Sequence, residues 1–220
     1  MQCLCPQLQD ARIAAHHQIA TCLWSEITEK QESKSRHCFT WAYETRVDEI
    51  RNIASIPPSS APRWRSLWDA FFSTSGASSE PLPADMARLR PDAVAIRWDK
   101  RRMFLLEVTR PYDSRSDFAS RPHLAEKLSK YQAVAQRFMA VAQNWQVSVI
   151  PFTVGVRGSI DVIAWKEHLD ALGVAPAAIP RLIRNVMSSA LSALDTIYDA
   201  RSYALRDDSH LARHSLHDIR

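Results

Sequence analysis

The chain has 220 residues, of which 46% are hydrophobic and 24% charged, and its formal net charge is +4. This composition is typical of a folded globular protein with one ordinary domain, with or without an appendage, and excludes a disordered chain. The small positive excess fits a polyanionic partner but does not require one. Only four glycines occur, with no Walker or Gly-x-Gly-x-x-Gly sequence, so no nucleotide cofactor is expected.

Neither a membrane span nor an export signal is predicted. No apolar run approaches the ~20 residues that cross a bilayer, and the N-terminus lacks the apolar segment of a secretory signal. The four cysteines lie near the N-terminus, at Cys3, Cys5, Cys22 and Cys38. Without export, these thiols are expected to stay reduced in an intracellular setting.

In the first third of the chain, apolar residues recur at helical spacing. They predict a helix over 7–29, a polar break at 30–39 and a second helix over 40–54. Proline- and serine-rich stretches at 56–63 and 73–84 then predict loops.

The middle of the chain changes to strand character. Alternating apolar residues predict strands over 91–98 and 103–109, and the charged turn 99–102 joins them as an antiparallel hairpin. A long amphipathic helix over 119–144 and another strand over 147–156 follow.

The last third is predicted to be helical. One helix covers 160–172, a long one runs from Pro180 to about Ala204, and the polar end at 207–220 is expected to fray. We therefore expect an α/β fold with a small mixed sheet flanked by helices. The expected organisation is an N-terminal helical extension (1–39), a catalytic domain (40–205) that includes the long C-terminal helix, and a polar tail (206–220).

Two acids lie on the predicted hairpin, Asp92 at the start of one strand and Glu107 within the next. Each shares a strand face with apolar residues, where a carboxylate is costly unless its charge is compensated. A divalent cation held between the two acids would compensate both. Mg²⁺, or Mn²⁺, prefers oxygen ligands, so the backbone carbonyl of Val108 is a natural third ligand. In the structural alternative, Arg90 or Arg110 merely pairs with Glu107.

Lys127 and Tyr131 are four residues apart on the following helix and therefore share one face. That face packs on the sheet and would aim Lys127 toward the acids, whereas Lys130 points toward phosphate or solvent. A bound cation makes a water more acidic and neutralises phosphate charge. A nearby lysine would orient that water or stabilise the reacting phosphate.

Three motifs in this region resemble a known family. They are Arg-Pro-Asp at 90–92, Leu-Leu-Glu-Val-Thr-Arg-Pro-Tyr-Asp at 105–113 and Lys-x-x-Lys-Tyr at 127–131. They are similar to the restriction-like endonuclease domain of non-LTR retrotransposons, a branch of the PD-(D/E)XK nuclease superfamily. The resemblance covers about 88–205.

This resemblance implies a PD-(D/E)XK restriction-endonuclease-like core that uses Mg²⁺ to nick DNA and prime reverse transcription in the nucleus. It makes Asp92, Glu107, Lys127 and Tyr131 the expected catalytic residues. In that lineage the lysine expected two residues after the second acid lies on the following helix. Here Thr109 fills the strand position behind the metal ligands, and Lys127 would replace the missing lysine.

The front of the chain resembles the same family, in which a Cys-Cys-His-Cys zinc knuckle precedes the endonuclease. The helix pattern Arg-Ile-x-x-His-x-x-Ile that follows such a knuckle is matched by Arg12, Ile13, His16 and Ile19. Cys5 would then be the last knuckle ligand, and the chain a C-terminal piece of a longer polyprotein without its reverse transcriptase. The alternative is a complete zinc site built from Cys3, Cys5, His17 and Cys22, whose spacing is poor for tetrahedral coordination.

Basic residues supply the candidate DNA contacts, namely Arg90, Arg110, Lys130 and Arg157. The segment Gly155-Val-Arg-Gly158 either offers backbone amides to phosphate or simply forms a tight turn. The basic residues at 100–102 are also expected to cluster around the proposed site.

Three further acids have roles that the sequence leaves open. Asp113 would hold a water or Lys127, or it would cap the following helix. Glu44 or Glu49, on the predicted second helix, would supply the additional acid that related nucleases carry. The sequence does not choose between them.

The functional prediction is Mg²⁺-dependent hydrolysis of DNA phosphodiester bonds. The rival from another class is an inactive or domesticated remnant that binds nucleic acid or a protein without cutting. A third possibility, an unrelated α/β protein, predicts that Asp92 and Glu107 lie far apart.

Overall fold

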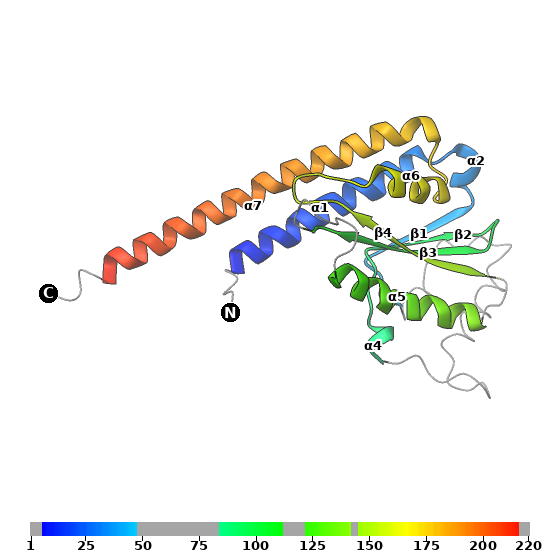
Figure 1. Cartoon of the computed structure of the whole chain (residues 1–220), viewed down its shortest axis with the longest axis horizontal. Coiled ribbons are helices and arrows are strands. Elements are labelled where there is room, and N and C mark those ends of the chain that lie inside the picture. Colours follow the sequence, from blue (N-terminus) through cyan, green and yellow to red (C-terminus); the bar gives the residue numbers. More distant parts are fainter. Residues whose placement is uncertain (1–5, 48–83, 112–121, 142–144, 216–220) are drawn as a thin grey trace.

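The computed structural model describes residues 6–47, 84–111, 122–141 and 145–215 (Figure 1). Its elements in chain order are α1 (Pro6–Lys30), α2 (Ser33–Arg36), β1 (Phe39–Tyr43), α4 (Ala84–Ala87), β2 (Ala93–Arg97), β3 (Arg102–Thr109), α5 (Pro122–Val141), β4 (Gln146–Thr153), α6 (Val162–Ala171), the 3₁₀ helix η2 (Pro176–Ala178) and α7 (Ile179–Ser215).

The four strands form one mixed sheet in the order β1-β2-β3-β4. β2 pairs antiparallel with both β1 and β3, whereas β3 and β4 are parallel. A parallel pair needs a crossover connection, and α5 lies within the one between β3 and β4. The predicted α/β architecture, a small mixed sheet flanked by helices, is confirmed.

Helices cover both faces of this sheet, with α1, α6 and α7 on one side and α5 on the other (Figure 1). Because strand side chains alternate, β3 contributes to two separate cores. Phe104 and Leu106 pack in the core on the α1 side, and Met103 and Leu105 in the core with α5. β3 is buried on both faces, so a carboxylate on it enters an apolar environment.

The N-terminal helix belongs to the first of these cores. Ile19, Leu23 and Ile27 recur along α1 at helical spacing and are fully buried. They share one hydrophobic cluster with the sheet and with the stripe of α7 that begins at Leu182 and Val186. α1 is therefore held against the sheet along much of its length.

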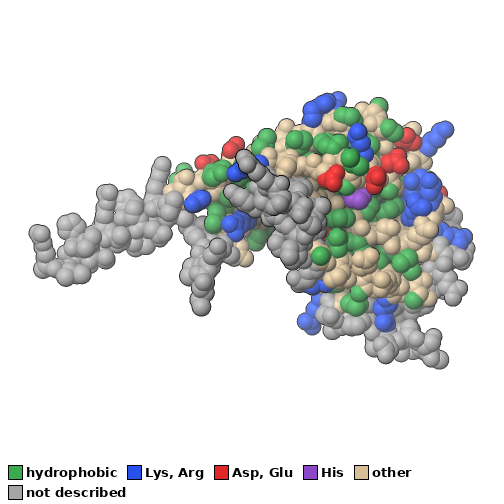
Figure 2. Space-filling model, in the orientation of Figure 1, with side chains coloured by type: hydrophobic (Ala, Val, Ile, Leu, Met, Phe, Trp, Pro, Cys, Tyr) green, Lys and Arg blue, Asp and Glu red, His purple; other side chains and the backbone are tan. Residues whose placement is uncertain are grey.

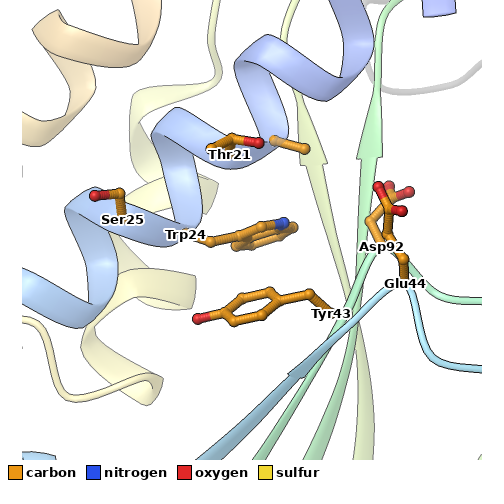
Figure 3. Close-up of a pocket in the computed structure, with 7 residues that line it drawn as sticks. Thr21, Trp24, Ser25, Tyr43, Glu44 and Asp92 are labelled. Atoms are coloured by element: carbon orange, nitrogen blue, oxygen red, sulfur yellow. The ribbon is translucent and has the colours of Figure 1, made fainter.

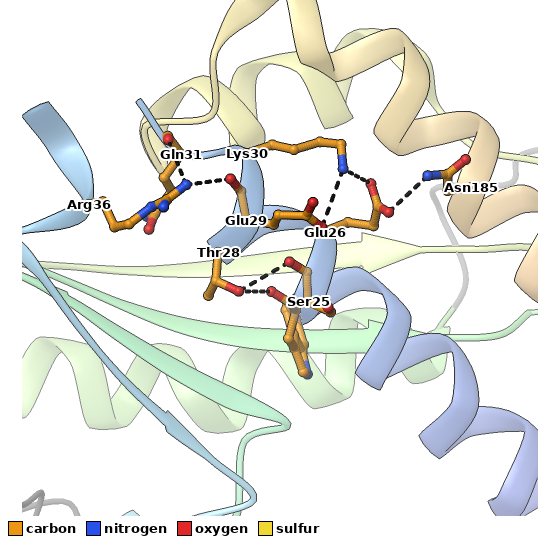
Figure 4. A network of polar contacts seen from close by, with 9 residues as sticks. Ser25, Glu26, Thr28, Glu29, Lys30, Gln31, Arg36 and Asn185 are labelled. Carbon is orange, nitrogen blue, oxygen red and sulfur yellow. Dashed lines mark hydrogen bonds and ion pairs between the residues drawn. The ribbon is translucent and has the colours of Figure 1, made fainter. Parts of the chain in front are cut away.

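A polar network ties α1 to α7 (Figure 4). The Glu26 carboxylate accepts a hydrogen bond from the Asn185 side chain at 2.8 Å and forms an ion pair with Lys30, also at 2.8 Å. Burial raises the pKa of Glu26, but the contacts with Lys30 and Asn185 outweigh burial and bring the pKa below its usual value. The carboxylate is thus charged and held between the two helices.

Two predicted elements differ from the structure. The helix predicted over 40–54 is wrong at its start, because Phe39–Tyr43 is the edge strand β1 paired with β2, and 48–54 lie outside the described residues. The last helix does not end near Ala204 but continues to Ser215, since no Gly or Pro interrupts it after Pro180. The predicted loop 56–63 lies outside the described residues, as does 73–84 except for Ala84, where α4 begins.

Candidate functional site

Three acids form a row across the end of three neighbouring strands. The register that pairs Ala93 with its two neighbouring strands, continued by one residue, places Asp92 between Glu44 and Glu107. The Glu44 backbone N–H donates to the Asp92 carbonyl at 3.2 Å, so the β1–β2 ladder does extend this far. Residues directly opposite one another on paired strands lie close enough to interact.

The Asp92 carboxylate is held from two sides. Its Oδ2 accepts a hydrogen bond from the Val108 backbone N–H at 2.6 Å. Its Oδ1 lies 3.1 Å from Nε2 of His16, which comes from α1. Both side chains are mostly buried, with exposed fractions of 20% for Asp92 and 27% for His16. The carboxylate is therefore fixed in orientation between β3 and α1.

Glu107 is buried and receives a hydrogen bond from the Tyr131 phenol. The exposed fractions are 3% for the glutamate and 6% for the tyrosine. Burial, followed by the charge of Glu107 and its hydrogen bond, and then the charge of Asp92, raises the pKa of Tyr131 well above its usual value. The phenol therefore stays protonated and acts as a donor toward Glu107.

The Val108 backbone completes this arrangement. In a strand, the N–H and C=O of one residue point to the same side, and the Val108 N–H points to Asp92. The Val108 carbonyl consequently faces the Asp92 side of β3, while the Thr109 carbonyl accepts from Val154 on the β4 side. Oxygen donors from Asp92, Glu107 and Val108 suit a hard cation such as Mg²⁺ or Mn²⁺.

Thr109 is the last residue of β3. Its hydroxyl lies 3.2 Å from that of Thr153, so it links β3 to β4. Lys127 is on α5, one turn before Tyr131, but its side chain lies outside what the structure describes. Asp113 is also outside the described residues.

The four candidate DNA-contacting residues lie on different segments and differ in exposure. Arg90 is exposed just before β2, and Lys130 is exposed on α5. Arg110 is half-buried after β3, with its guanidinium 3.5 Å from the Val156 carbonyl. Arg157 is exposed in a turn closed by Gly158, whose positive φ of 82° explains that glycine.

The basic residues at 100–102 do not cluster around the acids, contrary to the prediction. They lie in the β2–β3 turn and at the first residue of β3, at the opposite end of β2 from Asp92, about 17 Å away along the strand. Figure 2 shows Lys and Arg side chains gathered at this end, where α2 and the turn lie. The two acids lie at the open end of the β2–β3 hairpin, and the charged turn lies at its closed end.

Two residues at the row were not assigned correctly from the sequence. The sequence relates His16 only to a zinc-knuckle pattern. It predicts Glu44 as a possible additional acid on a helix, whereas the structure places Glu44 directly after β1. Glu44 has a positive φ of 48°, and its Oε1 lies 2.7 Å from Nδ1 of His17. The Arg-Ile-x-x-His pattern marked His16 as unusual but carried no signal that α1 meets Asp92.

The metal sites that the sequence suggests lie partly outside the described residues. Within the described ranges, no three His, Cys, Asp or Glu side chains are arranged to hold a metal ion. Cys3 and Cys5 are outside those ranges, and Cys22 and Cys38 are free thiols. A cation at the row of acids would thus depend on a backbone oxygen as well as on carboxylates.

The function of this protein has to be inferred from the geometry of the site. No protein-family model and no curated protein matches this sequence. Along the parts of the chain that the structure describes, no helix combines the length and apolarity needed to cross a membrane.

Proposed function

We propose that this protein is a metal-dependent endonuclease of the PD-(D/E)XK type that hydrolyses DNA phosphodiester bonds. The observation that carries the proposal is the placement of Asp92 opposite Glu107, with the Val108 backbone bound to Asp92. Two acids on adjacent strand ends, one of them buried, form a costly arrangement that a divalent cation would stabilise. The small mixed sheet supports the same family, and the motifs suggest target-strand nicking by a nuclear retrotransposon protein.

Asp92, Glu107 and the Val108 carbonyl would hold the cation, Mg²⁺ or Mn²⁺. When bound, the ion would supply a more acidic water and neutralise charge on the phosphate. His16 and the Val108 N–H keep the Asp92 carboxylate oriented, and Tyr131 does the same for Glu107. Such partners, which orient a ligand from behind, commonly affect metal affinity 10–100-fold.

The remaining roles follow from position. Lys127, on the α5 turn before Tyr131, would orient the water or stabilise the charged phosphate, as a lysine at this spacing shares the helix face. Arg90, Arg110, Lys130 and Arg157 would bind the DNA backbone, where each neutralised phosphate adds affinity that weakens as salt rises.

The second candidate is a remnant that binds nucleic acid or a protein without cutting. The observation that favours it is that both acids already have partners, His16 for Asp92 and Tyr131 for Glu107. A carboxylate satisfied in this way needs no cation for its own stability.

A supercoiled-plasmid nicking assay with Mg²⁺ or Mn²⁺ tests the proposal. We expect the wild-type protein to nick the plasmid. Asp92→Asn and Glu107→Gln should each lose roughly 100-fold or more in rate, because each removes a proposed ligand of the cation. The matched control is Asp99→Asn, because Asp99 pairs with Arg97 at the opposite end of β2. Equal nicking by all four proteins would exclude this site.

A further inference from the structure

A hollow of about 420 Å³ opens beside Asp92, between α1 and the end of β1. Figure 3 shows the Trp24 and Tyr43 rings on one side and the carboxylates of Glu44 and Asp92 on the other. Thr21 and Ser25 complete the wall on α1. The volume lies within the range of small-molecule sites. Since Asp92 is part of this wall, any occupant lies next to the proposed reaction centre.

The aromatic side of the hollow continues along the edge strand. Tyr43 is 46% exposed and stacks on Trp41, with ring centroids 6.2 Å apart and planes inclined by 14°. Trp41 in turn stacks on Phe39 at 6.1 Å, and the Arg97 guanidinium lies 5.3 Å from the centre of that ring. β1 thus carries a row of parallel rings that leads from the basic β2–β3 turn to the hollow.

The carboxylate side restricts what can enter. Ionised carboxylates only accept hydrogen bonds, so Glu44 and Asp92 favour a group with N–H donors and repel a phosphate. Glu44 uses Oε1 for His17, and its second oxygen has no other partner among the residues that the structure describes. The occupant is therefore expected to combine a flat apolar face with N–H donors on its edge.

A nucleobase with an exocyclic amino group meets both requirements. We propose that the hollow receives one unpaired adenine, cytosine or guanine of the nucleic-acid substrate, stacked on Tyr43 and hydrogen-bonded to Glu44. This inference rests on the proposed nuclease function and adds that the substrate presents an unstacked base beside the phosphate to be cut. Bases inside a duplex cannot reach such a site, so single-stranded or bulged DNA is preferred.

An organic cation is the competing occupant, because aromatic rings and carboxylates also suit an arginine or methylated lysine side chain. The row of rings favours a nucleic acid. One cation would use Tyr43 and Trp24 alone. The aromatic edge instead continues from Tyr43 through the partly buried rings of Trp41 and Phe39 to the Arg97 guanidinium, which suits a nucleic-acid strand that runs on past the bound base.

The test measures binding without cleavage, using fluorescently labelled hairpin DNA in EDTA. One hairpin carries a single bulged adenine, a second carries a bulged thymine and a third is fully paired. We expect the wild-type protein to bind the bulged adenine most tightly. Tyr43→Leu should weaken that binding by roughly 5- to 100-fold, the range for loss of one stacked base. The control Tyr43→Phe retains the ring and should bind like the wild type.

Glu44→Gln separates hydrogen bonding from stacking. We expect it to reduce the preference for adenine over thymine while the preference for bulged over paired DNA remains. Circular dichroism of each variant checks the fold, and the exposed position of Tyr43 on an edge strand favours tolerance of leucine.

The outcomes distinguish this inference from the proposed function. Asp92-dependent nicking together with equal binding of all three hairpins would overturn the inference alone. A Tyr43-dependent preference for the bulge without any nicking would support the binding site and remove the nuclease function. If tetramethylammonium, and not DNA, changes the tryptophan fluorescence in a Tyr43-dependent way, the occupant is a cation and the inference is wrong.

Discussion

The phenol of Tyr131 on α5 donates a hydrogen bond to the Glu107 carboxylate on β3, and both side chains are buried. This contact joins the crossover helix to the strand that carries the second acid. It also explains how the protein tolerates a carboxylate in an otherwise apolar core before any cation is bound. The row of acids is therefore supported from α5 as well as from α1.

The first prediction concerns the stability of this contact. The pKa of Tyr131 is raised in the folded protein, while in the unfolded chain the phenol ionises near pH 10. The contribution of Tyr131 to stability is thus fully present below about pH 10 and declines as the pH rises further. Tyr131→Phe should cost about 2 kcal/mol at pH 7, because the lost hydrogen bond is to a buried carboxylate. Between pH 9 and pH 10.5, the melting temperature of Tyr131→Phe should also fall less than that of the wild type. Parallel pH profiles for the two proteins would contradict the assignment.

The second prediction concerns the cation. A ligand that binds only the folded state at ten times its dissociation constant stabilises that state by about 1.4 kcal/mol. For a domain of this size we expect Mg²⁺ to raise the melting temperature by roughly 3–6 °C. The increase should disappear in Asp92→Asn and persist in Asp99→Asn, as measured by differential scanning fluorimetry. No increase in the wild type at any millimolar Mg²⁺ concentration would favour the non-cutting remnant.

The third prediction makes His16 a positioning residue for Asp92. We expect His16→Ala to raise the Mg²⁺ concentration for half-maximal nicking by about 10-fold, because the carboxylate loses one of its two orienting contacts. His17→Ala is the matched control, since the pair of His17 with Glu44 is half exposed. The two half-activation concentrations can be compared in one metal titration. If both variants require the same concentration as the wild type, His16 does not position Asp92.

The hairpin that carries the acids could be predicted because its sequence signal is local. Val94 and Ile96 alternate with Ala93 and Ala95, and a charged turn follows within a few residues. From these residues alone, two acids on adjacent antiparallel strands could be expected. The pairing of β2 with β3 in the structure agrees with that expectation.

The other half of the site depends on contacts between distant parts of the chain. β1 has only five residues, and Tyr43 and Val47 also fit helical spacing, so the strand becomes evident only through its pairing with β2. His16 and Asp92 are 76 positions apart. No local pattern indicates which helix face crosses the strand end, and the sequence therefore led to a knuckle interpretation of His16.

The last prediction concerns Glu26, which fixes α1, and hence His16, relative to α7. The pKa of Glu26 is lowered in the folded protein, so its stabilising effect is present above the unfolded pKa near 4.3 and is lost as the pH falls through the folded value. Glu26→Gln removes the ion pair with Lys30 and should cost about 1 kcal/mol at pH 7. The melting temperatures of variant and wild type should converge as the pH falls toward 3.

Glu29→Gln provides the matched control for this prediction. Glu29 is 72% exposed and lies 3.7 Å from the same lysine, so its loss should leave the melting temperature within about 2 °C of the wild type at either pH. A difference between Glu26→Gln and the wild type that stays constant from pH 7 to pH 3 would mean that packing, and not the charge, holds the two helices together. In that case the position of His16 beside Asp92 would depend mainly on the apolar contacts of α1, among them those of Ile19 and Leu23.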